Sequence, residues 1–107
     1  MGPSEWLYRS TLLSFLYGIG LDVDAETHTS KGRADMTVKF RGRTWVMELK
    51  VAQKGEDAGK LADAALSQIT ERGYADRFDS AVLLGLAIDD ERRSIEEYRV
   101  KKRSGVA

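Results

Sequence analysis

Apolar and polar residues alternate along three short segments of the chain, residues 21–29, 34–40 and 44–51. Because successive side chains of a strand point to opposite faces, this alternation predicts three strands that each bury one face. Residues 41–43 read Arg-Gly-Arg, a short link that suits a hairpin between the second and third strands. The buried face of the third strand would carry Trp45, Met47, Leu49 and Val51.

Two further segments have the pattern of helices. Residues 5–18 follow the candidate N-cap Ser4, and their apolar positions cover more than one stripe, which predicts substantial burial. Residues 56–72 begin with acidic side chains, which favour a helix start, and carry an alanine-rich stripe that permits close packing. The apolar run 81–88 predicts a strand covered on both faces, and residues 94–100 predict an edge strand.

These elements predict an α/β fold in the order α-β-β-β-α-β-β. The connection from the third strand through the second helix is long enough for a crossover, so the strands on either side of it should be parallel. We therefore expect a mixed β-sheet of about five strands flanked by helices. Residues 1–107 are expected to form one domain, because a chain of this length supports a single modest core.

Composition excludes several classes of protein. The chain is 42% hydrophobic and 32% charged, as in globular rather than disordered proteins. It has no cysteine, which excludes disulfides and thiolate metal sites and favours a cytoplasmic location. No apolar run approaches the roughly 20 residues of a membrane helix, and no secretory signal is evident at the N-terminus.

The charge balance argues against tight, non-specific binding of nucleic acid. Seventeen basic and seventeen acidic residues give a net charge of zero, whereas such binders are usually basic. Basic residues nevertheless concentrate at the C-terminus and around the predicted hairpin, although most clusters of this kind are simply solvated surface. The hairpin cluster consists of Lys31, Arg33, Lys39, Arg41 and Arg43.

The candidate chemistry lies on the polar sides of the second and third strands. Asp35 belongs to the second strand, and Glu48 and Lys50 share one face of the third. Closing the hairpin brings Asp35 toward Glu48, where two carboxylates and an ammonium group could hold a divalent cation and steer a water. Without a cation, carboxylates about 4 Å apart repel by about 4 kcal/mol at an effective dielectric constant near 20. The alternative is a salt-bridge cluster on a solvated sheet face.

Three segments resemble motifs of the PD-(D/E)xK phosphodiesterase superfamily, and the resemblance spans roughly residues 6–98. The segments are ETHTSKGRAD at 26–35, VMELK at 46–50 and QITERGYA at 68–75. More narrowly, the chain resembles the nuclease-type domain found behind predicted AAA-type ATPase domains in bacterial proteins. Ala34 stands where the family name has proline. The resemblance implies a restriction-endonuclease-like fold.

The same resemblance implies roles for individual residues. Asp35 and Glu48 would ligate Mg²⁺ or Mn²⁺ with the backbone carbonyl of Leu49, while Lys50 would orient or activate the attacking water. Gln68 lies at the border of its helix's apolar stripe, where it would bond water, phosphate or Lys50, or simply mark that border.

The sequence leaves more than one role open for Glu26, Glu5 and Tyr74. Glu26 matches an acidic family position, as an additional ligand or second-shell group, or is an ordinary acid on a solvated face. Glu5 matches a metal-associated acid on the first helix of some members, although an acid is favourable in any first turn. Tyr74 would contact nucleic acid or pack under the sheet. The expected nucleic-acid contacts are Lys31, Arg33, Arg43 and Tyr74.

The leading interpretation is a metal-dependent nuclease that cleaves DNA rather than RNA. Its alternative is a catalytically inactive nuclease-fold domain that serves nucleic-acid binding or protein assembly. The intact Asp, Glu and Lys favour the enzyme, and the zero net charge favours the alternative. The resemblance adds a homodimer, or an ATPase domain of a longer parent chain, as expected partners. The chain itself has no G-x-x-x-x-G-K-[ST] loop for nucleotide chemistry.

Overall fold

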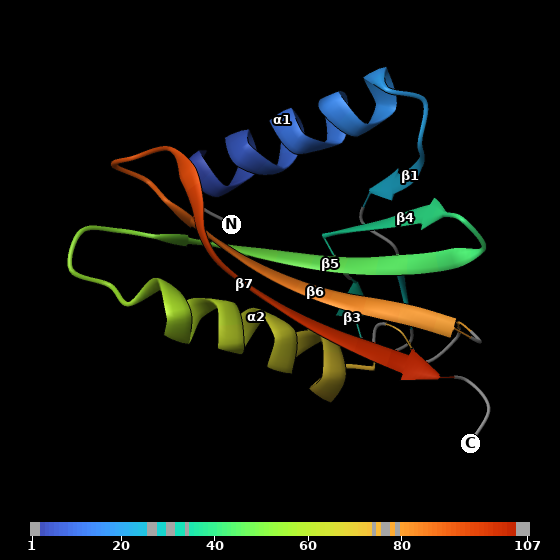
Figure 1. The fold of residues 1–107 in the computed structure, drawn as a ribbon. Helices are drawn as coiled ribbons and strands as arrows, with labels where there is room; N and C mark the ends of the chain where they lie inside the picture. The colour runs from blue at the N-terminus through green and yellow to red at the C-terminus, as the bar shows by residue number, and fades with distance from the viewer. Residues whose placement is uncertain are drawn as a thin grey trace.

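A computed structural model of the chain describes residues 3–25, 28–29, 32–33, 35–73, 75, 78 and 80–104. The main sheet has five strands in the order β1-β4-β5-β6-β7, and β2 and β3 form a separate two-stranded sheet (Figure 1). This arrangement confirms the predicted α/β fold. The elements are α1 (Pro3–Gly18), β1 (Asp22–Ala25), β2 (His28–Thr29), β3 (Gly32–Arg33), β4 (Met36–Phe40), β5 (Arg43–Ala52), α2 (Ala58–Glu71), β6 (Ser80–Asp89) and β7 (Ser94–Ser104).

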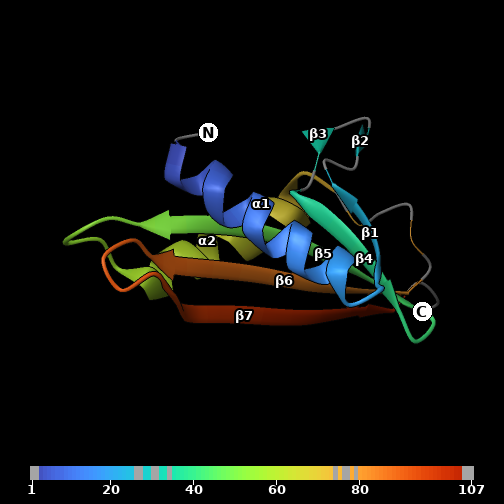
Figure 2. The ribbon, with the colours of Figure 1, turned by 90° about the horizontal axis from the view of Figure 1, so that it is seen from above.

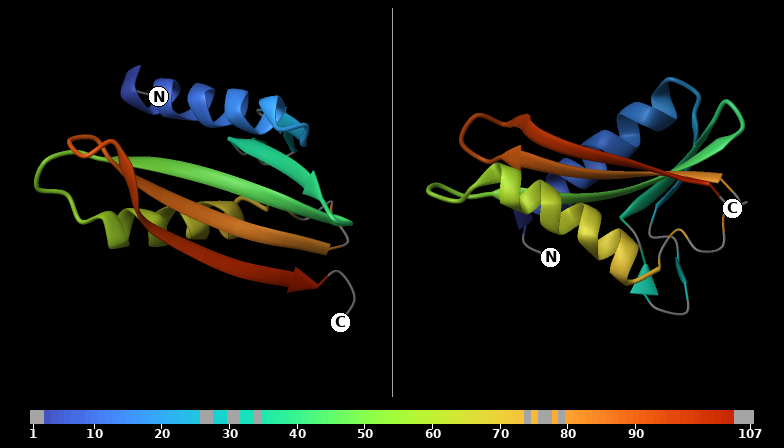
Figure 3. Two further views of the ribbon diagram at one scale, coloured as in Figure 1. Left: turned by 45° about the horizontal axis from the view of Figure 1, so that its top comes forward. Right: turned by 60° about the horizontal axis from the view of Figure 1, so that its bottom comes forward.

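The two helices lie on opposite sides of the main sheet (Figure 3). α2 packs against β5, β6 and β7, where Val46, Ile69 and Leu83 belong to one buried cluster. α1 packs against β1 and β5 on the other side, where Leu12 and Leu16 contribute to a second cluster. Strand β5 therefore has a core on both of its faces.

The β4–β5 hairpin is closed by Arg41 and Gly42, which both have positive φ angles of 51° and 74°. Two such residues are typical of the tight turn whose twist matches a hairpin. The pairing runs from Phe40 opposite Arg43 to Met36 opposite Met47, while β5 continues to Ala52. The second half of β5 thus extends beyond its pairing with β4.

The predicted crossover is confirmed, because β5 and β6 are parallel and α2 connects them. α2 begins after Asp57, whose side chain accepts a hydrogen bond from the backbone N–H of Lys60 at 3.2 Å, as expected of an N-cap. Neither helix is long and apolar enough to cross a membrane in the described part of the chain.

We expect Gly85→Ala to destabilise the fold, because α2 packs directly on this position of β6. A Cβ atom at Gly85 would lie 2.7 Å from both the Ala62 carbonyl oxygen and the Leu66 backbone nitrogen. The α2 backbone would have to shift, at roughly 1–3 kcal/mol. Gly18→Ala is the control, since nothing lies within 4 Å of its added Cβ. Urea unfolding measures both, and an unchanged midpoint for Gly85→Ala would contradict this packing.

Several details of the predicted elements are wrong. α1 begins at Pro3, so Ser4 is inside the helix rather than its N-cap; proline suits a first helical turn because its missing N–H is not needed there. α1 is also less buried than predicted, since it packs on the sheet through one stripe only. Its exposed apolar residues are Trp6, Leu7, Phe15 and Tyr17.

The predicted strand 21–29 is divided between two sheets. Its first part is β1, paired with β4, where Val23 is buried and Asp22 and Asp24 are exposed as the alternation predicted. Its second part contains β2, which pairs with β3 away from the main sheet (Figure 2). Alternation identifies an extended segment, but the identity of its partner strand depends on contacts far along the chain.

Candidate active site

The two predicted carboxylates come together where β4 ends and β5 continues. Asp35 directly precedes Met36, the first residue of β4. Because Met36 pairs with Met47 in an antiparallel ladder, Asp35 lies next to the following residue of β5, Glu48. Asp35 is 8% exposed and Glu48 is 4% exposed. The Asp35 Oδ2 atom accepts a hydrogen bond from the backbone N–H of Leu49 at 2.9 Å. The alternative of a solvated surface cluster is therefore wrong, because α2 covers this face of β5.

Gln68 of α2 connects the acid and the lysine. Its Nε2 atom donates to Glu48 Oε2 at 2.9 Å, and its Oε1 atom accepts from Lys50 Nζ at 2.8 Å. Glu48 and Lys50 point to the same face because they are two residues apart on β5. The contact between Gln68 and Lys50 is one of the possibilities that the sequence left open for this glutamine, and it places the ammonium group beside the carboxyl pair.

One carboxyl group of the pair, that of Glu48, has a raised pKa. The pKa of Glu48 is raised from 4.5 to about 9, mainly by burial and then by the hydrogen bond and negative charge of Asp35, while Lys50 opposes the shift. A protonated Glu48 donates to Asp35, which relieves the repulsion between two buried carboxylates. The proton thus neutralises one of the two adjacent negative charges, as a bound cation would.

α1 brings two more charged side chains to the pair. Arg9 Nη1 lies 3.9 Å from Asp35 Oδ1, with only 12% of the arginine side chain exposed. One turn earlier, burial and the charge of Asp35 raise the pKa of Glu5, and Lys50 lowers it, so Glu5 lies within electrostatic range of the site. Arg9 was not identified from the sequence. Its available signal was a charged residue on the same helix stripe as Leu12 and Leu16.

The oxygen atoms present fit a hard divalent cation. Asp35 and Glu48 supply carboxylate oxygens, and the Leu49 peptide already contacts Asp35 through its N–H. Mg²⁺ and Mn²⁺ favour carboxylate and carbonyl oxygens, and a buried pair that retains a proton is a suitable place for such an ion. Among the described residues, no three His, Asp or Glu side chains gather at one point.

Most of the remaining predicted site residues cannot be placed relative to this pair. Glu26, Lys31 and Tyr74 lie outside the described residues. Arg33 belongs to β3, but its side chain is outside the description. Arg43 is exposed at the start of β5, five residues before Glu48 and hence roughly 17 Å away along the strand.

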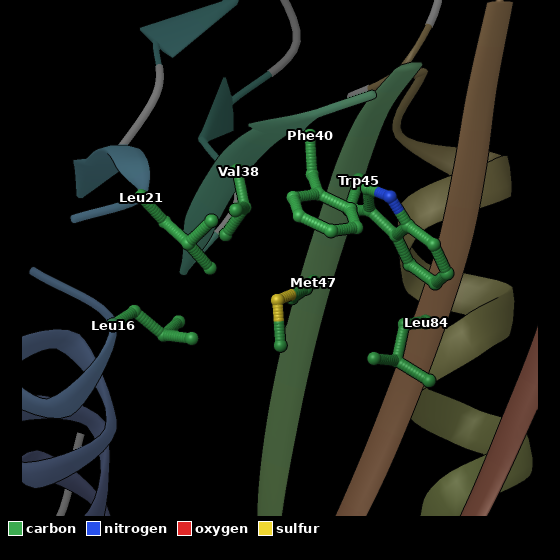
Figure 4. A pocket seen from close by; sticks show the side chains of 7 residues that line it. All are labelled: Leu16, Leu21, Val38, Phe40, Trp45, Met47 and Leu84. Atoms are coloured by element: carbon green, nitrogen blue, oxygen red, sulfur yellow. The ribbon is translucent and has the colours of Figure 1, made fainter. Parts of the chain in front are cut away.

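An apolar pocket lies on the opposite face of the sheet, so it is separate from the carboxyl pair (Figure 4). Met47 and Trp45 enter it from β5, and Glu48 between Met47 and Leu49 points away. A site for charged phosphate groups is not expected there. Its lining residues are Leu16, Leu21, Val38, Phe40, Trp45, Met47 and Leu84.

Comparisons with known proteins identify a family. The sequence model of the PD-(D/E)XK nuclease superfamily matches residues 3–98. An uncharacterized protein encoded in the vnfD 5′ region of Azotobacter chroococcum mcd 1 is 36% identical over 101 residues. That match covers 91% of this chain but 19% of the relative, so the chain spans less than a fifth of the relative's length. The chain belongs to the PD-(D/E)XK nuclease superfamily.

Proposed function

We propose that the chain is a metal-dependent nuclease that hydrolyses phosphodiester bonds of DNA. The observation that carries the proposal is the buried pair of Asp35 and Glu48, joined through Gln68 to Lys50. A buried acid pair in which the pKa of Glu48 is raised, with an ammonium group beside it, is costly for stability and suits a catalytic site. Membership of a superfamily whose nucleases generally use divalent metals supports the same conclusion.

In this proposal each residue has a distinct task. Asp35, Glu48 and the Leu49 carbonyl would hold Mg²⁺ or Mn²⁺, and Glu48 would lose its proton on doing so. When bound, the cation supplies positive charge that polarises the phosphodiester and lowers the pKa of a nearby water. Lys50 orients that water and offsets the negative charge that develops on the phosphate. Gln68 accepts a hydrogen bond from the Lys50 ammonium group and so holds it in position.

The second candidate function is a nuclease-fold domain without turnover, used for nucleic-acid binding or protein assembly. The observation that favours it is the zero net charge, which leaves few cations for the phosphates of DNA. Metal binding without cleavage of any DNA would support this second candidate.

Partners other than DNA also belong to the proposal. The Azotobacter relative extends far beyond the matched region, which supports a role as one domain of a longer protein, such as one with an ATPase domain. A homodimer is the other assembly, and it would place two sites on a symmetric substrate. Exposed apolar residues of β7 offer a contact surface in either case: Ile95, Tyr98 and Val100.

Calorimetric titration of Mn²⁺ into the metal-free protein tests the metal site. We expect the wild type to bind Mn²⁺ at one class of site. Its unfolding midpoint should rise at saturating Mn²⁺, because a ligand that binds the folded state stabilises that state. Glu48→Ala should lose both effects. Glu71→Ala, which removes an exposed acid from the end of α2, is the control and should retain them. No heat and no shift of the midpoint in the wild type would refute the metal site.

A further inference from the structure

Arg9 is a largely buried charged side chain beside the carboxyl pair. Only 12% of its side chain is exposed, and its Nη1 atom faces Asp35 Oδ1 at 3.9 Å. The distance is long for an ion pair: on the surface, Arg99 Nε approaches Asp63 Oδ1 to 2.8 Å. The Arg9 guanidinium group therefore offsets the charge of Asp35 across a distance longer than that of a direct hydrogen bond.

The two oxygens of Asp35 have different neighbours. Oδ2 accepts the backbone N–H of Leu49, and Oδ1 is the atom that faces Arg9. Figure 2 shows the N-terminal end of α1 beside the end of β5, on the side away from β6, where β4 no longer pairs with β5. The half of α1 that carries Arg9 thus lies near the part of β5 that follows its pairing with β4, and Arg9 contacts the carboxyl pair through Asp35.

We propose that Arg9 is a phosphate-binding residue of this site, and the proposal rests on the proposed nuclease function. In the metal-free protein its guanidinium group offsets the charge of Asp35. Asp35 and Glu48 would take the positive charge they need from a bound divalent cation, and the Arg9 guanidinium group would then bind a phosphodiester of the substrate. Guanidinium groups suit this change of partner because their planar fork matches both carboxylate and phosphate.

A purely structural role for Arg9 makes different predictions. An ion pair that only anchors α1 to the sheet would lower the unfolding midpoint when broken. It would not change the affinity of the folded protein for DNA. A residue that positions Asp35 for the metal would weaken metal binding when removed. The proposed role predicts the opposite sign for the metal, because removing a positive charge beside the ion favours its binding.

The experiment compares Arg9→Gln and Arg9→Lys with the wild type in two assays. Calorimetry measures the affinity for Mn²⁺ alone, and fluorescence anisotropy measures the affinity for a labelled DNA duplex with Ca²⁺ as the cation. We expect Arg9→Gln to bind Mn²⁺ several-fold more tightly and DNA about tenfold more weakly. Arg9→Lys should stay near the wild type for Mn²⁺ and recover part of the DNA affinity. Arg92→Gln, which removes an exposed surface ion pair with Glu96, is the control and should change neither affinity.

The outcomes separate this inference from the proposed function. If the wild type binds neither Mn²⁺ nor DNA, both are wrong. If the wild type binds both and Arg9→Gln has the same two affinities, only the role of Arg9 is wrong. Weaker Mn²⁺ binding by Arg9→Gln overturns the inference in favour of a positioning role, and a lower unfolding midpoint with unchanged affinities overturns it in favour of an anchor for α1.

Discussion

Lys50→Ala is expected to reduce metal-dependent cleavage of DNA by about 10²–10⁴-fold, the range typical of removing a positioned catalytic group. The Lys50 ammonium is half-buried and held by Gln68 at 2.8 Å, next to the carboxyl pair. Its removal takes away the charge that would orient the water and stabilise the phosphate. The fold and Mn²⁺ binding should remain, since neither carboxylate is altered. Single-turnover cleavage with saturating Mn²⁺ measures the loss.

The neighbouring residue provides the control for stability. Leu49 is 2% exposed and points to the opposite face, so Leu49→Ala should cost roughly 2–5 kcal/mol of unfolding free energy. Lys50→Ala should cost far less while losing far more activity. Full activity in Lys50→Ala, with a normal unfolding midpoint, would show that the lysine has no catalytic role.

The sequence predicted those parts of the fold that depend on local patterns. Alternation identified β4 and β5, the alanine-rich stripe identified α2, and a link with Gly42 indicated the hairpin. The parallel pairing of β5 and β6 followed from the length of the crossover. Asp35, Glu48, Lys50 and Gln68 could be placed together because hairpin closure and strand period bring the first three residues close.

The parts that the sequence did not predict depend on long-range packing. Alternation shows that Glu48 and Lys50 share a polar face, but whether that face is solvated depends on where α2 lies. The burial of α1 was predicted too high because apolar residues around a helix do not reveal how much sheet is available to cover them. Arg9 was missed for the same reason, since its contact with Asp35 joins elements separated along the chain.

The metal-free protein should become less stable as the pH rises from about 5 to 9. In the folded state Glu48 keeps its proton up to about pH 9, whereas in the unfolded chain it loses it near the ordinary pKa of 4.5. The folded state therefore binds more protons across this interval, and the stability present below pH 4.5 is lost as the pH rises through the folded pKa. The unfolding free energy should fall by up to about 1.4 kcal/mol per pH unit from this group.

Glu48→Gln isolates this effect from all other titrating groups. The amide replaces the protonated carboxyl group, so it can donate to Asp35 and accept from Gln68 at any pH. Urea unfolding at pH 5.5 and 8.5 should show a large loss of stability for the wild type and a much smaller one for Glu48→Gln. Saturating Mn²⁺ should restore the wild type at pH 8.5, where the carboxylate is freed most easily, and should not affect Glu48→Gln. Parallel pH profiles for the two proteins without metal would mean that Glu48 is ionised in the folded state, and that the buried pair is neutralised by another group.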